Sequence, residues 1–225
     1  MIKKKCRLCS SKKLFKFLNL GLHPPSDQFK KQNDLQNPTL FYPLEVCSCI
    51  KCGFKQLSYV VDPQILYQQN YPYESSLTRE GKKHYGEFSD SIVKDFNLFK
   101  NDLVVDIGSN TGVLLRAFKN RKMKVIGVDP ASNICRIANR SGIKTINSFF
   151  NLKVVNRINK HYGKAKVITG TNVFAHVDNL HTFVKNIKKL IHKKKGIFVI
   201  EVPHFLHLIK TLEYDTIYHE HLSYI

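Results

Sequence analysis

Residues 103–112 read LVVDIGSNTG, a run that passes from an apolar strand-forming segment into a loop with two glycines. The apolar residues around Asp106 predict a buried strand, and residues 112–118 begin a helix. Glycine lets the backbone approach a ligand closely, at Gly108 and again at Gly112. An acid at the end of such a strand can bind a charged or hydroxyl group. This stretch therefore predicts a ligand-binding turn between a strand and a helix.

Three further apolar segments follow at residues 125–129, 166–169 and 196–201. Amphipathic helical segments separate them, which is typical of a parallel sheet covered by helices on both faces. We therefore predict an α/β fold with a doubly wound, Rossmann-like domain. A flavodoxin-like or other doubly wound domain with a coincidental loop is the alternative reading of the same pattern.

The 225 residues favour one ordinary domain and a smaller one. We expect a small domain over residues 1–62, a helical connector over 63–98, the Rossmann-like domain over 99–203, and the start of a catalytic region over 204–225. No segment has the length and apolarity of a membrane span, and polar residues and cysteines follow the first lysines where a signal peptide needs an apolar run. We expect a cytoplasmic protein whose cysteines are reduced or metal-bound.

Two Cys-x-x-Cys pairs lie in the small domain, formed by Cys6 with Cys9 and by Cys49 with Cys52. Each pair can place two thiolates on one tetrahedral ion, so that the four together predict a structural zinc site with no position open for chemistry. Cys47 could replace Cys49, but only Cys49 has the two-residue spacing. The alternative is two unrelated cysteine pairs.

The loop at residues 106–112 does not match the dinucleotide fingerprint G-x-G-x-x-G, since Asn110 occupies the position of the middle glycine. It resembles the D-x-G-x-x-x-G loop of class I S-adenosylmethionine-dependent methyltransferases. The strand at 125–129 ends in Asp129, which could bind the ribose hydroxyls of the cofactor. The candidate cofactor-binding residues are Asp106, Gly108, Ser109, Asn110, Gly112, Asp129 and Asn172.

Histidine and tyrosine gather after the third strand and near residue 225. In doubly wound folds the segment after a strand faces the ligand crevice, which places Asn172 and His176 near a substrate. Residues 218–224 read YHEHLSY, in which His221 could act as a general base oriented by a carboxylate such as Glu220. A lone histidine is more often packed or at the surface, and this spacing is not that of a catalytic zinc motif.

The order of these motifs resembles the nucleotide-sugar C-methyltransferases, which methylate carbon 3 of a dTDP-4-keto-6-deoxyhexose. The resemblance rests on the two cysteine pairs, YPYESS at 71–76, DIGSNTG at 106–112, GVDP at 127–130, NVFAHV at 172–177 and YHEHLSY at 218–224. It implies S-adenosylmethionine as cofactor, structural zinc, and a nucleotide-sugar substrate. It also implies His221 as the base, with roles near the sugar for Tyr218, Glu220, His176, and either Tyr71 or Tyr73.

The family continues for more than a hundred residues beyond the YHEHLSY motif, whereas this sequence stops at Ile225. We therefore expect a truncated chain that is nearly inactive alone, and a separately encoded C-terminal half is one partner that this interpretation allows. An inactive methyltransferase remnant is the alternative.

The net charge of +19 suggests a second alternative, a zinc-ribbon RNA methyltransferase or an RNA-binding module. However, the sequence has 29 lysines and only 7 arginines, whereas nucleic-acid recognition favours arginine. The lysines are also spread along the chain. We favour a solvated basic surface, which would equally suit an anionic substrate, over a nucleic-acid interface.

Overall fold

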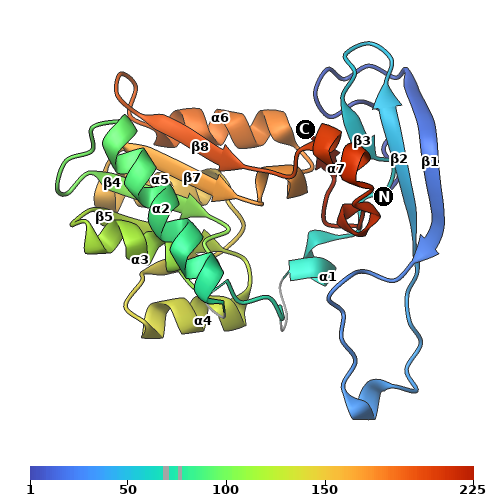
Figure 1. Ribbon diagram of the computed structural model, residues 1–225, viewed down its shortest axis with the longest axis horizontal. Helices are drawn as coiled ribbons and strands as arrows, with labels where there is room; N and C mark the ends of the chain where they lie inside the picture. Colours follow the sequence, from blue (N-terminus) through green and yellow to red (C-terminus); the bar gives the residue numbers. More distant parts are fainter. Residues whose placement is uncertain (68–70, 76–77) are drawn as a thin grey trace. The chain divides into compact units, whose positions relative to one another are not determined.

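The computed structural model describes residues 1–67, 71–75 and 78–225, which form two compact units (Figure 1). Unit 1 comprises Met1–Leu66, Phe174–His181 and Val202–Ile225. Unit 2 comprises Tyr67–Val173 and Thr182–Glu201. In the described residues, no helix is both long enough and apolar enough to cross a membrane.

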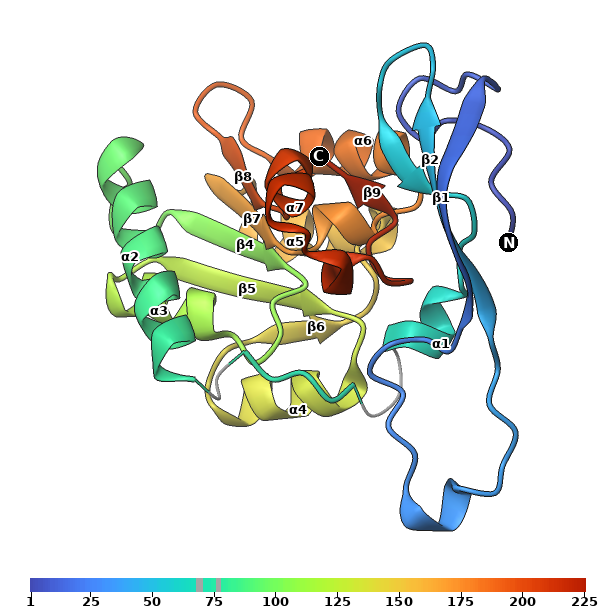
Figure 2. The ribbon, with the colours of Figure 1, turned by 45° about the vertical axis from the view of Figure 1, so that its right-hand side comes forward.

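Unit 2 is built on a parallel five-stranded sheet in the order β6-β5-β4-β7-β8 (Figure 2). Its strands are β4 (Leu103–Ile107), β5 (Lys124–Asp129), β6 (Thr145–Asn147), β7 (Val167–Thr171) and β8 (Ile197–Glu201). The four expected strands are present, and the short β6 adds an edge. The prediction of a doubly wound α/β domain is confirmed.

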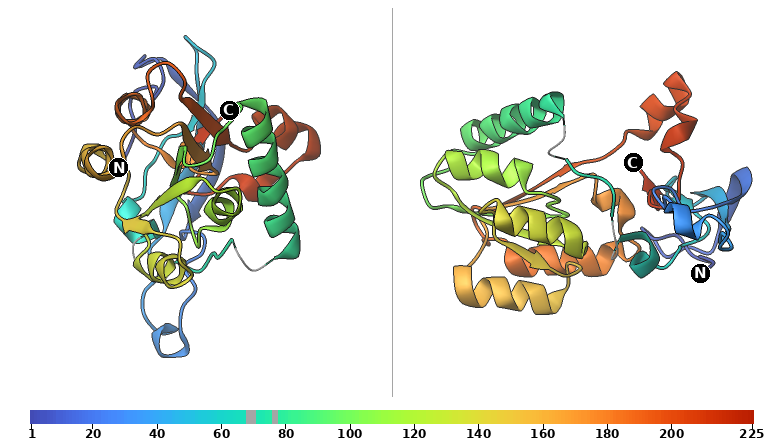
Figure 3. Two further views of the ribbon diagram at one scale, coloured as in Figure 1. Left: turned by 90° about the vertical axis from the view of Figure 1, so that its left-hand side faces the viewer. Right: turned by 90° about the horizontal axis from the view of Figure 1, so that it is seen from below.

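Helices cover both faces of this sheet. They are α2 (Arg79–Asp95), α3 (Val113–Asn120), α4 (Ser132–Arg140), α5 (Leu152–Tyr162) and α6 (Leu180–Leu190). Figure 3 shows α5 and α6 on the face opposite α2 and α3. A buried cluster that includes Leu115, Phe118 and Val104 joins α3 to the sheet. The Thr78 hydroxyl caps α2 by accepting from the Gly81 amide, so this helix lies within the helical connector expected over residues 63–98.

The chain enters this sheet at its centre. It leaves β4 toward β5 and β6 on one side and returns to β7 and β8 on the other, so that the strand order reverses between β4 and β7. In open α/β sheets, ligands bind beyond the carboxyl ends of the strands at such a point. Asp106 on β4 and Thr169 on β7 are register partners there. The topology therefore places the glycine loop where a ligand is expected.

Unit 1 is built on an antiparallel sheet in the order β1-β2-β3-β9. Its strands are β1 (Leu14–His23), β2 (Tyr42–Cys49), β3 (Lys55–Leu57) and β9 (Ser223–Tyr224), with α1 (Pro63–Tyr67) after β3 and the short turns η1 (Gln32–Asp34) and η2 (Phe174–His176). The sheet supports a buried apolar cluster around Leu44, Val46 and Leu57.

The final residues of the chain belong to the same unit. α7 (Phe205–Thr211) and η3 (Tyr214–Thr216) lead into β9, whose Tyr224 pairs with Lys55 of β3. Ile217 and Leu222 join the apolar cluster of unit 1. The structure thus divides the chain differently from the four expected pieces, because pairing between β3 and β9 is a long-range contact that local sequence patterns do not report.

Candidate functional site

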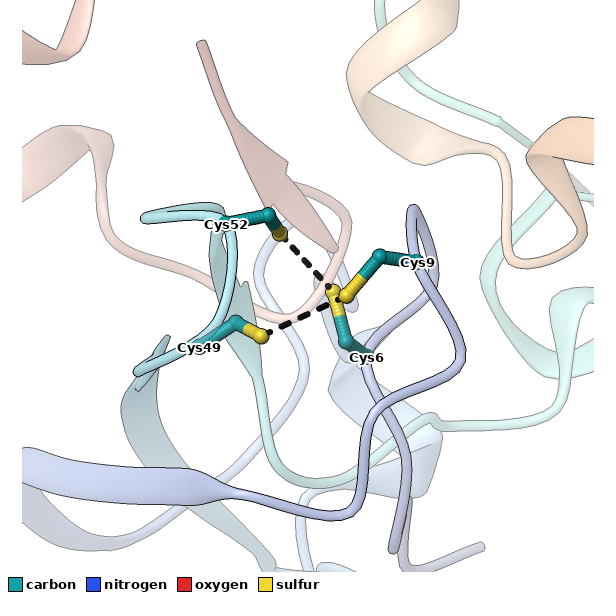
Figure 4. A group of neighbouring side chains, drawn as sticks. All are labelled: Cys6, Cys9, Cys49 and Cys52. Atoms are coloured by element: carbon teal, nitrogen blue, oxygen red, sulfur yellow. Dashed lines mark hydrogen bonds between the residues drawn. The ribbon is translucent and has the colours of Figure 1, made fainter.

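The four paired cysteines converge in unit 1. Cys6 and Cys9 come from the N-terminal loop, Cys49 from the end of β2, and Cys52 from the turn that follows it (Figure 4). Their sulfur atoms all lie within 4.8 Å of one another, with 3.7 Å between Cys6 and Cys52 and 3.6 Å between Cys9 and Cys49. Zinc bound tetrahedrally at about 2.3 Å from each sulfur would place the sulfurs about 3.8 Å apart. The geometry therefore fits one four-thiolate zinc ion.

The choice between Cys47 and Cys49 follows from the same geometry. Among the described residues, the cluster includes Cys49 and leaves out Cys47, although both side chains are buried. Residues two apart in a strand point to the same face, but Cys49 ends β2 and its amide donates to the Phe54 carbonyl in the turn. Gly53 adopts a φ of 77°, which permits that turn.

The glycine loop of unit 2 has the tight geometry that its sequence predicts. Gly108 has a φ of 67°, and a Cβ atom there would lie 2.2 Å from the Val173 side chain. Gly112 has a φ of 82°, and a Cβ atom there would lie 2.7 Å from Ile143. Any larger residue would displace its neighbour at both positions. The Ser109 hydroxyl is buried in the loop and has no hydrogen-bond partner among the described residues.

Two buried carboxylates lie beside this loop. Asp129 accepts from the amides of Asn110 and Ala131, both at 2.9 Å. Asp106 accepts from the Thr169 hydroxyl at 2.7 Å, and burial raises its pKa to about 7. Burial also raises the pKa of Asp129. Each Asp129 oxygen has a second lone pair, so the residues present fit a ribose with two hydroxyl donors.

The remaining candidates in unit 2 lie close to the loop or follow β7. Asn172 has a φ of 55°, and its amide donates to the Glu201 carbonyl while its side chain is exposed. The backbone carbonyls of Tyr71 and Tyr73 accept from Asn133 and Asn110, respectively. The Tyr73 side chain is 57% exposed, so it is available to a ligand.

In unit 1 the structure brings together the other four candidates. The Tyr218 hydroxyl lies 2.9 Å from Nε2 of His221, and their rings are 4.2 Å apart. The His176 ring is 5.1 Å from that of His221, and its Nδ1 lies 3.8 Å from a Glu220 carboxylate oxygen. All four side chains come from η2 and the segment before β9.

The hydrogen bonds of His221 determine its tautomer. Its Nδ1 lies 2.8 Å from the Thr216 carbonyl, which can only accept, so Nδ1 carries the proton. Nε2 therefore holds the lone pair, and the Tyr218 hydroxyl donates to it. Burial lowers the pKa of His221, and burial with the neighbouring His221 lowers the pKa of His176 to about 3. The His221 imidazole is thus neutral at neutral pH, with a lone pair on Nε2.

Sequence reasoning missed several polar residues of these sites. Thr169 binds Asp106, Ser75 binds Asn110 and Thr111, and His84 on α2 binds Glu201 at 2.8 Å. Ser75 lies within the quoted YPYESS motif, which could have indicated it. Thr169 and Glu201 could be found only from the rule that parallel strands end at one edge.

Two family models match the chain. A model described as "Putative zinc binding domain" matches residues 6–67, and a model described as "Methyltransferase domain" matches residues 82–225. The chain belongs to this methyltransferase family, whose members take S-adenosylmethionine as cofactor, and it carries the four-cysteine cluster within the matched zinc-binding region.

Relatives are found among both curated proteins and solved structures. The chain is 32% identical to the C-methyltransferase NovU of Streptomyces niveus over 97% of its own length and 52% of the length of that protein. It therefore spans about half of this curated relative. An S-adenosylmethionine-dependent methyltransferase of Clostridium acetobutylicum is 18% identical with a TM-score of 0.47, over 58% of this chain and 54% of that one. The plantazolicin methyltransferase BpumL is 14% identical with a TM-score of 0.48, over 61% and 52%. The match to NovU does not favour the RNA-directed alternative.

Proposed function

We propose that this chain carries the cofactor-binding and proton-abstracting groups of a C-methyltransferase that acts on carbon 3 of a nucleotide-linked 4-keto-6-deoxy sugar. The observation that carries the proposal is the fixed tautomer of His221, whose Nε2 is held as an acceptor next to Tyr218. The name of the relative NovU supports methyl transfer to carbon.

A keto group at carbon 4 acidifies the proton on carbon 3, and the chemistry needs a neutral base to remove it. His221 would take this proton on Nε2, while the electron pair of the C–H bond forms the enolate. Protonated His221 would then carry a positive charge next to the Thr216 carbonyl. Tyr218 now donates to Nε2, and its hydroxyl would turn to the substrate when the base takes up the proton.

His176 and Glu220 would complete this set of groups. His176 remains neutral because its pKa is low, so it would donate or accept a hydrogen bond without adding charge. Glu220 is 1% exposed and lies close to His176, where its carboxylate would orient that ring. Tyr71 or Tyr73 would contact the sugar, as the family resemblance implies.

S-adenosylmethionine would supply an electrophilic methyl group. The loop at residues 106–112 would hold its amino-acid part, and Asp129 its ribose. The enolate electron pair would form the new carbon–carbon bond, and the electrons of the broken carbon–sulfur bond would remain on the sulfur atom. His221 later releases its proton to solvent, which returns the base to its neutral form.

Methyl transfer can be tested with labelled S-adenosylmethionine and a dTDP-4-keto-6-deoxyhexose. We expect the label in the sugar, and magnetic resonance should locate it on carbon 3. His221→Asn should abolish the transfer, since Asn can keep the bond to Thr216 but has no basic nitrogen. His161→Asn on the exposed surface of α5 is the matched control and should transfer normally. Label on an oxygen or nitrogen atom would contradict the proposal.

A further inference from the structure

Asn110 occupies a backbone position that glycine would fill more easily. Its φ is 48°, in the left-handed region that costs most side chains free energy. It also stands where the dinucleotide fingerprint has its middle glycine. Asn tolerates this region better than most residues, but Gly tolerates it at no cost. We therefore expect the side chain of Asn110 to have a role that offsets this conformational cost.

The Asn110 side chain binds a segment that is distant in sequence. Its Oδ1 accepts from the Ser75 amide at 3.0 Å, from the Ser75 hydroxyl at 3.2 Å and from the Thr111 amide at 2.8 Å. Its Nδ2 donates to the Tyr73 carbonyl at 3.0 Å. A flipped amide would set Nδ2 against these N–H donors, so the partners determine its orientation.

The backbone of Asn110 also contacts the acid that we propose binds the cofactor ribose. Its amide donates to Asp129, the acid proposed for the ribose. A second tether comes from Asn133 on α4, whose Nδ2 donates to the Tyr71 carbonyl at 2.9 Å. Ser75 is buried and its hydroxyl also lies 3.3 Å from that of Thr111. All these contacts lie within unit 2.

We propose that Asn110 is a positioning residue that fastens the segment Tyr71–Ser75 to the cofactor loop. It thereby presents the exposed Tyr73 side chain for substrate. The role of Tyr73 toward a sugar rests on the proposed function. The fastening itself does not, because it depends only on contacts within the chain.

Asn110→Gly is the most informative variant, since Gly adopts the same φ without strain and removes only the side chain. Hydrogen exchange of the Ser75 amide should become about tenfold faster or more, because this amide loses its acceptor, Oδ1 of Asn110. Exchange of the amides in the buried strand β4 should keep the parent rate. Asn110→Asp is the matched control. It keeps the acceptor for Ser75 and places a carboxylate oxygen against the Tyr73 carbonyl, so the Ser75 amide should stay better protected than in Asn110→Gly.

Unchanged exchange of the Ser75 amide in Asn110→Gly would overturn the proposal. Faster exchange in β4 together with a loss of Tm would also overturn it, because it would indicate that Asn110 supports the loop as a whole. Neither measurement uses a sugar. Failure here is therefore distinct from failure of the proposed reaction. Where the sugar is turned over, Asn110→Gly should raise its KM more than it lowers kcat.

Discussion

The hydroxyl of Tyr218 donates to Nε2 of His221 across 2.9 Å, three residues further along the chain. On the other side of the same ring, Nδ1 donates to the Thr216 carbonyl. The His221 ring is thus held from both sides in one tautomer. The Tyr218 hydroxyl must move away for Nε2 to take up a proton, as the proposed role of His221 requires.

The pH dependence of proton abstraction should reflect the low pKa of His221. Burial lowers this pKa below its ordinary value near 6.5. The neutral base is therefore fully present at pH 7, and the rate should fall only when the pH is lowered through the pKa of the folded protein. We expect a flat rate between about pH 7 and 8 and a decline well below pH 6.5. A decline centred above pH 7 would contradict the assignment.

Tyr218→Phe removes the contact to Nε2 and keeps the ring packing. We expect a loss of roughly tenfold or more in the rate of proton abstraction, as for other single positioned groups. The His221 pKa, followed by magnetic resonance of the imidazole, should also shift. Tyr214→Phe is a control with an exposed side chain in the same region. An equal loss in both variants would show that the effect is not specific to the base.

Metal analysis should give about one zinc ion per chain, as four-thiolate sites do. Cys49→Ser should lose zinc and destabilise unit 1, because metal binding contributes directly to the folding of small domains. Cys47→Ser should retain zinc, since Cys47 lies outside the cluster. Zinc retained in the Cys49 variant and lost in the Cys47 variant would mean that the ligand assignment is wrong.

Asp129→Ala should weaken binding of S-adenosylmethionine by about tenfold or more. The change removes the ribose acceptor and also leaves the buried amides of Asn110 and Ala131 without their partner. Asp129→Asn keeps one acceptor oxygen and should have the smaller effect. Calorimetry measures both, and tighter binding of a nicotinamide dinucleotide than of S-adenosylmethionine would contradict the reading of the loop.

Arg7 lies between the two cysteines of the first pair, and its side chain is 2% exposed. It donates to the Leu57 carbonyl and pairs with Asp178 at 3.2 Å, while Lys3 pairs with the same carboxylate from a more exposed position. Arg7→Met should lower the free energy of unfolding by about 1–3 kcal/mol, because the buried Leu57 carbonyl loses its donor while Asp178 keeps Lys3 as a partner. Lys3→Met should cost less than about 1 kcal/mol. Equal losses in denaturant unfolding would contradict this difference.

The sheet of unit 2 and its glycine loop could be predicted because their signals are local. Each of these signals can be recognised from a short stretch of sequence. They are the apolar run at residues 103–107, the glycines at 108 and 112, and the acid at 129. The spacing of the cysteines likewise identified the cluster. The strand β6 was not predicted, because its three residues are too few to show an apolar pattern.

The placement of the final residues could not be predicted in the same way. Leu222 and Tyr224 read as apolar positions near a sequence end, and nothing local indicates that they pack on Leu57 and pair with Lys55. The role of Asn110 could not be predicted either. The sequence shows that Asn110 stands at a glycine position of the dinucleotide fingerprint, but only the structure identifies Ser75 and Tyr73 as its partners.

The most direct test of the account is exchange of the carbon 3 proton of a dTDP-4-keto-6-deoxyhexose in deuterated solvent without cofactor. This measurement separates proton abstraction from methyl transfer. We predict weak exchange, above the uncatalysed background, for the parent chain, loss of that exchange in His221→Asn, and exchange at the parent rate in His161→Asn and Asp129→Ala. Exchange in His221→Asn as fast as in the parent would contradict the account, and His176 would then be the next candidate for the base.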